Sequence, residues 1–186
     1  QEARLKLEEA GVILFKDASA NKGGVTSSSS EVLASLCMND EEHHRLMCIR
    51  DGVVPDFYKR YVVDTQNRIE SNANSEFECI WAESLRDPSV PRCIITDHLS
   101  ARINELNYQI RDSGLWDDRE LVKTVLKEVI PLSLQTELGL DKIVQRLPKS
   151  YVEATLSSHL AARYVYSHGL KANEFAFYQF MAQYRK

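Results

Sequence analysis

Apolar residues recur at helical spacing along most of the chain. From about residue 28 onward they are three or four positions apart, which places them on one face of an α-helix. The stripe over residues 55–85 weakens near 72–75, so one kinked helix or two helices fit it. The apolar stripes predict helices over residues 28–39, 55–85, 95–110, 121–129, 141–146, 150–168 and 173–184.

The last two predicted helices carry end signals. Ser150 and Glu153 have the spacing of a capping box, and Gly169 follows the end of the apolar stripe. Asn173 is a preferred N-cap residue for the final helix, whose aromatic stripe predicts core packing. The basic pair at 185–186 suits the negative end of that helix.

The first 30 residues show a different order. Residues 2–10 predict a helix that Gly11 closes, and the run VILF at 12–15 is typical of a strand buried on both faces. Helix, glycine and buried strand follow one another in open parallel sheets. A strand needs neighbours, and none is predicted after it. Because the chain also lacks an initiator Met, we expect it to begin inside a longer protein.

The stretch KDASANKGGVTSSSSE, residues 16–31, follows this predicted strand. A flexible linker would have no signals for regular secondary structure on either side. Here a strand is predicted before the stretch, and a helix is predicted to begin before the serines end. Glycines and hydroxyls at a helix start favour a site for a carboxylate or a phosphate. In the alternative interpretation, the serines only cap the helix. The sequence contains neither G-K-[ST] nor G-x-G-x-x-G, the phosphate-binding motifs of other nucleotide sites.

Composition narrows the possible partners. The chain has 186 residues, 27% of them charged, and a net charge of -4, which argues against a nucleic-acid binder. No apolar run approaches the ~20 residues that span a bilayer, so we expect no membrane insertion. The four cysteines lack C-x-x-C spacing, and we expect them to be reduced core residues of an intracellular protein. The adjacent His43 and His44 point in different directions on a helix, so no metal site is expected.

Two segments resemble a known family. The segment ANKGGVTSSSSE, residues 20–31, resembles A-N-A-G-G-V-x-x-S-G-x-E of the glutamate dehydrogenases. Residues 16–36 as a whole are most similar to the large NAD-specific enzymes of fungi and protists. The segments LPKSYVEATLSSHLAARYVYSHG and EFAFYQFM, at 147–169 and 174–181, resemble the C-terminal region of the same enzymes.

The resemblance implies oxidation of L-glutamate to 2-oxoglutarate and ammonium, with hydride transfer to NAD. It implies that Asn21, Gly23 and Gly24 contact the cofactor. It also implies that Val25 lines the substrate pocket and that Ser28 binds the distal carboxylate of glutamate. Two positions depart from the family pattern, because Lys22 and Ser29 replace small residues there. The serine run also leaves Ser27 as an alternative to Ser28.

No residue of this chain is expected to be catalytic, because the family's catalytic lysine and aspartate belong to an earlier domain. His159 and His168 are possible bases, but neither has a carboxylate at motif spacing. The expected fold is mainly α: residues 1–36 form the last αβ unit of a Rossmann-like NAD-binding domain, and residues 37–186 form a helical C-terminal region.

Further expectations are a homo-oligomer and a location in the mitochondrial matrix or the cytoplasm. Two other functions remain open at this point. One is a helical oligomerisation module without a ligand, and the other is a related dehydrogenase that acts on an apolar amino acid.

Overall fold

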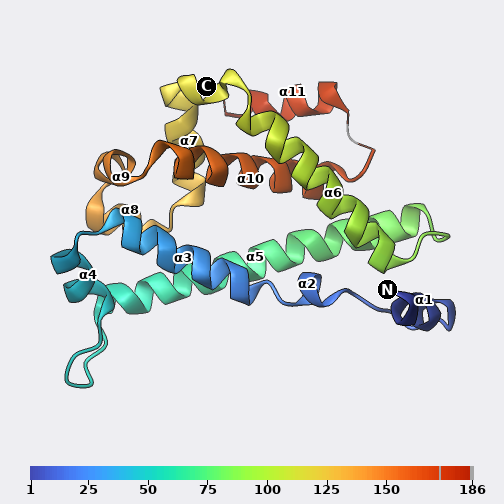
Figure 1. Cartoon of the computed structure of the whole chain (residues 1–186), viewed down its shortest axis with the longest axis horizontal. Helices are drawn as coiled ribbons and strands as arrows, with labels where there is room; N and C mark the ends of the chain where they lie inside the picture. Colours follow the sequence, from blue (N-terminus) through green and yellow to red (C-terminus); the bar gives the residue numbers. More distant parts are fainter. Residues whose placement is uncertain (172, 185–186) are drawn as a thin grey trace.

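A computed structural model describes residues 1–171 and 173–184, which form a bundle of helices (Figure 1). Within these residues no strand is formed beyond an isolated bridge between Arg50 and Val53. The predicted mainly α fold is therefore confirmed. In chain order the elements are α1 (Glu2–Glu9), α2 (Asp17–Ala20), α3 (Gly23–Cys37), α4 (Asp40–Met47), α5 (Asp56–Arg86), α6 (Arg92–Arg111), the 3₁₀ turn η1 (Gly114–Asp117), α7 (Arg119–Val129), α8 (Leu132–Leu138), α9 (Leu140–Arg146), α10 (Lys149–His168) and α11 (Glu174–Ala182).

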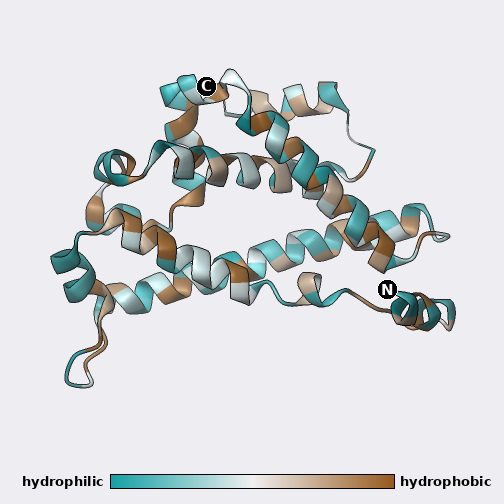
Figure 2. Cartoon of the chain, viewed as in Figure 1, coloured by the Kyte–Doolittle hydropathy of each residue, from teal (hydrophilic) through white to brown (hydrophobic). Residues whose placement is uncertain are grey.

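The core lies where α6 and α10 pack along each other and both contact α5. Leu99 of α6 and Leu156 and Leu160 of α10 are almost completely buried. Figure 2 shows apolar positions recurring at intervals along the helices, which is the pattern that predicted them. The weak stripe near residues 72–75 does not interrupt α5, which is one continuous helix.

The aromatic stripe of α11 packs on α10, as predicted. Tyr164 of α10 meets Phe177 and Phe180 edge to face, with ring centroids 5.2 and 5.4 Å apart. Its hydroxyl donates to the backbone oxygen of Asn173 at 2.7 Å. Asn173 in turn caps α11 by accepting from the backbone N–H of Ala176 at 3.0 Å. This predicted cap is confirmed, whereas the basic pair at 185–186 lies outside the described residues.

The predicted strand at 12–15 is wrong for this chain. The segment is irregular between α1 and α2, and Val12 and Ile13 are exposed. Strands require backbone hydrogen bonds to a neighbouring strand, and none of the described residues supplies such a partner. The expected αβ unit is thus present only as a helix, the confirmed turn at Gly11 (φ 85°) and an unpaired apolar segment.

The start of α3 also differs from the prediction. The helix begins at Gly23, five residues before the expected Ser28, and no side chain caps it. The serines lie inside the helix and therefore cannot cap its first N–H groups. The predicted capping box of Ser150 and Glu153 is likewise wrong, because α10 begins at Lys149 without a side-chain cap.

The four cysteines are free. Cys37, Cys79 and Cys93 are buried and Cys48 is half-buried, which confirms them as small packing residues. Gly169 ends α10 with φ 72°, as the sequence predicts.

Glu42 links the start of α4 to α9 and gives a prediction about acid stability. Its carboxylate accepts hydrogen bonds from Arg146 and Lys142 of α9 and from the backbone N–H of Asn39. These bonds lower the pKa of Glu42 to about 2. A depressed folded-state pKa adds stability above the unfolded value and loses it as the pH falls toward the folded value.

We expect Glu42→Gln to lower the free energy of unfolding by about 1–3 kcal/mol at pH 7. The difference from wild type should shrink as the pH falls from about 4.5 to about 2, because protonation removes the same charge. Urea unfolding at several pH values measures this. A difference that stays constant over that range would contradict the assigned role.

Candidate functional site

The candidate site lies where α2 ends and α3 begins. Asn21 follows α2 with its side chain exposed, and Gly23 and Gly24 form the first turn of α3. Val25 is 75% exposed and Ser28 is exposed. Helical spacing places Ser28 next to both Gly24 and Val25, which precede it by four and three residues. The five predicted site residues therefore lie close together, with Gly23 half-buried and the other four exposed.

The two glycines have no internal packing reason to be glycine. Both have ordinary helical φ values, and a Cβ on Gly24 would meet nothing within 4 Å. A Cβ on Gly23 would meet only the Asn21 Oδ1, at 3.8 Å. Glycine in a helix costs roughly 0.5–1 kcal/mol relative to alanine. Two such residues on an exposed turn favour a surface that another molecule approaches closely.

The first turn of α3 also has backbone N–H groups to offer. The first hydrogen bond of the helix runs from Thr26 N–H to Lys22 O, at 3.4 Å. The N–H groups of Gly23, Gly24 and Val25 precede it and have no carbonyl partner inside the helix. Such groups, with the helix dipole, attract anions. The predicted anion-attracting turn therefore begins at the glycines and not at the serines.

The serine hydroxyls are used inside the helix. Ser27 donates to Gly24 O at 3.1 Å, and Ser28 and Ser29 both donate to Val25 O, at 3.1 and 2.8 Å. A donating hydroxyl still has lone pairs that accept hydrogen bonds. To donate to a carboxylate, Ser28 would exchange its bond to Val25 O for one to the ligand.

Three contacts hold this segment on α5, which runs antiparallel to it. They are the packing of Phe15 on Phe77 (ring centroids 5.0 Å apart), the ion pair of Lys22 with Glu76, and the hydrogen bond from the Tyr61 hydroxyl to Ser30 O (2.6 Å). Burial raises the pKa of Tyr61, so its hydroxyl stays neutral and keeps donating. These supporting residues could not be predicted from the sequence, because no local pattern relates positions that lie 31 to 62 residues apart in the chain.

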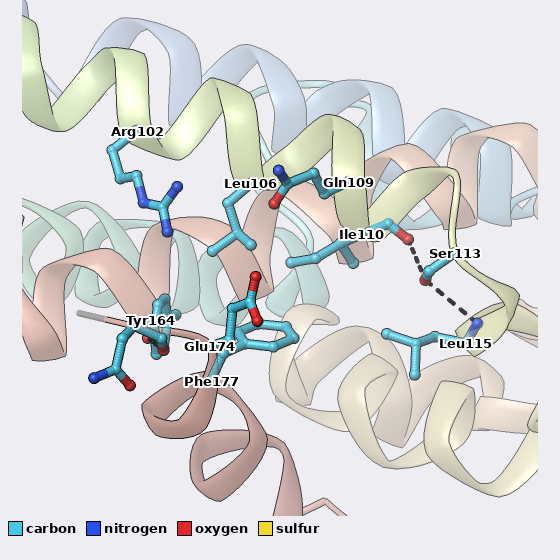
Figure 3. A pocket seen from close by; sticks show the side chains of 10 residues that line it. Arg102, Leu106, Gln109, Ile110, Ser113, Leu115, Tyr164, Glu174 and Phe177 are labelled. Carbon is cyan, nitrogen blue, oxygen red and sulfur yellow. Dashed lines mark hydrogen bonds between the residues drawn. The ribbon is translucent and has the colours of Figure 1, made fainter.

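A separate small pocket lies between α6, α10 and α11 (Figure 3). Its volume is about 150 Å³, and Leu106, Ile110 and Phe177 form part of its largely apolar lining. In Figure 3 the side chains of Arg102 and Glu174 reach its edge from different helices. None of the predicted site residues lines this pocket or the open hollow of about 760 Å³ beside α4.

His159 has a carboxylate partner that its local sequence does not reveal. Its Nε2 lies 3.3 Å from Oε2 of Glu128 on α7, and the Tyr184 hydroxyl donates to the same oxygen at 3.1 Å. Burial lowers the pKa of His159. Arg163 also forms an ion pair with Glu128. These contacts link α7 to α10, so His159 has a structural role in helix packing and is not an isolated base.

In the part of the chain that the structure describes, no group of three or more His, Cys, Asp or Glu side chains is arranged to hold a metal ion. None of the helices in residues 1–171 and 173–184 combines the length and the apolar character needed to cross a membrane.

Known proteins match both the site and the rest of the chain. Residues 1–87 match the Glutamate/Leucine/Phenylalanine/Valine dehydrogenase family. Glutamate dehydrogenase 2 of Dictyostelium discoideum is 54% identical over 181 residues, which are 97% of this chain. The NAD-specific glutamate dehydrogenases of Neurospora crassa and Saccharomyces cerevisiae are 47% and 41% identical, over 98% and 97% of the chain. Over nearly its whole length the chain is similar to NAD-specific glutamate dehydrogenases.

The expected resemblance is thereby confirmed over nearly the whole chain. The chain spans only about 17% of the length of each of these glutamate dehydrogenases. The family match ends at Asp87, the residue that closes α5. It therefore includes both the glycine turn and the helix that holds this turn. No solved structure matches the chain.

Proposed function

We propose that this chain is the C-terminal part of an NAD-dependent glutamate dehydrogenase, which converts L-glutamate to 2-oxoglutarate and ammonium. The observation that carries the proposal is 41–54% identity over nearly the whole chain to proteins named as glutamate dehydrogenases, three of them NAD-specific. Because the chain spans about 17% of their length, the activity belongs to a longer protein. This chain contributes one side of its site.

The turn fits a dinucleotide on chemical grounds. The exposed amide of Asn21 can both donate and accept hydrogen bonds, as the carboxamide of a nicotinamide requires. The open space over Gly24 lets a ligand reach the backbone. NAD supplies a hydride acceptor when bound. Asn21, Gly23 and Gly24 would hold and orient it, and no residue of this chain is proposed to be catalytic.

Val25 and Ser28 fit the side chain of glutamate. The Val25 side chain is apolar and exposed beside the Ser28 hydroxyl, so together they can contact methylene groups and a distal carboxylate. Helical spacing favours Ser28 over Ser27, because Ser28 is one turn after Gly24 and beside Val25. A hydroxyl at this position favours glutamate over leucine or phenylalanine, which the family name also includes.

We also propose that residues 1–36 complete the NAD-binding domain and that residues 37–186 form a helical C-terminal region. The apolar segment at 12–15 supports this division, because its exposed Val12 and Ile13 leave apolar surface for another part of the longer protein to cover. The proposed boundary falls in the last turn of α3, so this helix would join the two regions.

The test is Ser28→Ala in the full-length enzyme. Losing a hydrogen bond to a carboxylate costs about 1.5–3 kcal/mol, so we expect KM for glutamate to rise roughly tenfold to a hundredfold with little change in KM for NAD. Ser27→Ala is the matched control and should leave both values near wild type. Asn21→Ala should chiefly raise KM for NAD.

The same assay distinguishes the oligomerisation module and the apolar amino-acid dehydrogenase from the proposed function. Unchanged glutamate kinetics in Ser28→Ala would contradict the role of Ser28 in binding substrate, as expected if the turn holds no ligand. A preference for leucine or phenylalanine over glutamate would favour a related amino-acid dehydrogenase.

A further inference from the structure

Glu76 is a buried acid with partners on two other helices. It lies in α5 and is 5% exposed. Its Oε2 accepts a hydrogen bond from the Tyr166 hydroxyl of α10 at 2.5 Å and forms an ion pair with the Lys22 ammonium. A buried carboxylate is tolerated only when it is paired and hydrogen-bonded. These partners are therefore strongly constrained in position.

Lys22 lies between two of the predicted cofactor-binding residues of the turn. It is the N-cap residue of α3, between Asn21 and Gly23. A lysine beside an anion-attracting turn can bind the anion directly or can hold the turn in place. Its side chain is only 25% exposed, and its ammonium already engages Glu76. This geometry favours the holding role.

We infer that Lys22 and Glu76 are positioning residues that fix the glycine turn against α5 and thereby set where the cofactor and substrate residues lie. The inference rests on the proposed function of that turn. Tyr166 extends the same contact to α10, so the helical region would help to shape a site that it does not line. Burial raises the pKa of Tyr166, which keeps its hydroxyl available as a donor.

The experiment is a double-mutant cycle in the full-length enzyme. Lys22→Met and Glu76→Gln each break the ion pair. The double variant removes the same ion pair and no further interaction between these two residues. A misplacement of the turn by a fraction of an ångström to 1 Å can cost up to about a hundredfold in rate. We expect kcat/KM for glutamate oxidation to fall roughly fivefold to fiftyfold in each single variant and no further in the double variant. Lys22→Arg should largely restore it.

The thermal midpoint of each variant is measured in parallel, so that lost activity is not confused with lost folding. If Glu76→Gln fails to fold, Lys22→Met is compared with Lys22→Arg instead. The arginine variant keeps the positive charge that pairs with Glu76, so a positioning role predicts that it restores activity. Near-wild-type kinetics in Lys22→Met would overturn the inference. A loss in Lys22→Met without a loss in Glu76→Gln would also overturn it, since direct contact of Lys22 with a ligand predicts that pattern.

Failure of this inference can be separated from failure of the proposed function. If Asn21→Ala and Ser28→Ala alter kinetics as expected but the ion-pair variants do not, only the positioning role is wrong. If Asn21→Ala and Ser28→Ala leave kinetics unchanged, the proposed function of the turn is itself wrong, and so is an inference that depends on it.

Discussion

Gly169→Ala is expected to lower the free energy of unfolding of the chain by about 3–5 kcal/mol. Gly169 ends α10 with φ 72° and ψ -165°, a conformation that is essentially restricted to glycine and costs other residues about 1–3 kcal/mol. The added Cβ would overlap the buried carboxylate of Glu83. Glu83 would then lose its hydrogen bond from the Leu170 N–H (3.0 Å), which adds about 1.5–3 kcal/mol.

Two alanine substitutions separate these causes. Gly139→Ala carries a similar backbone strain (φ 78°, ψ 138°) in open space, so it should cost only about 1–3 kcal/mol. Gly114→Ala carries neither strain nor overlap and should be nearly neutral. Urea unfolding of the chain measures all three. If Gly169→Ala lowers the free energy of unfolding no more than Gly139→Ala does, the overlap with Glu83 makes no contribution and this part of the prediction is wrong.

Leu160→Ala is expected to cost about 2–5 kcal/mol, the usual range for removing a fully buried leucine side chain. Leu160 is completely buried on α10, a helix that packs against both α6 and α5. The lost apolar contacts and the cavity left behind both contribute. A change of this size should lower the thermal midpoint of a domain of this length by several degrees.

The matched control is Leu85→Ala on α5, where the leucine side chain is exposed. Surface substitutions of this kind stay within about 0.5 kcal/mol. Equal effects of Leu160→Ala and Leu85→Ala would contradict the placement of Leu160 in the core.

Much of the candidate site could be predicted from the sequence. Asn21, Gly23, Gly24, Val25 and Ser28 lie within eight residues, so one short motif contains them all and any helix start would keep them close. The supporting contacts could not be predicted in this way. Glu76 meets Lys22 from 54 residues further along the chain, and Tyr166 meets Glu76 from 90 residues beyond that, so their spacing carries no local signal.

The sequence by itself determined the helical character of this protein. It also determined the ends of several helices, as Gly11, Gly169 and Asn173 show, because helical spacing and end signals act between residues a few positions apart. Only the tertiary structure decided where α3 begins, that residues 12–15 form no strand, and which partners Glu76 and His159 have. These outcomes depend on segments that meet only when the helices pack, and packing against α5 outweighs the low helical propensity of the glycine turn.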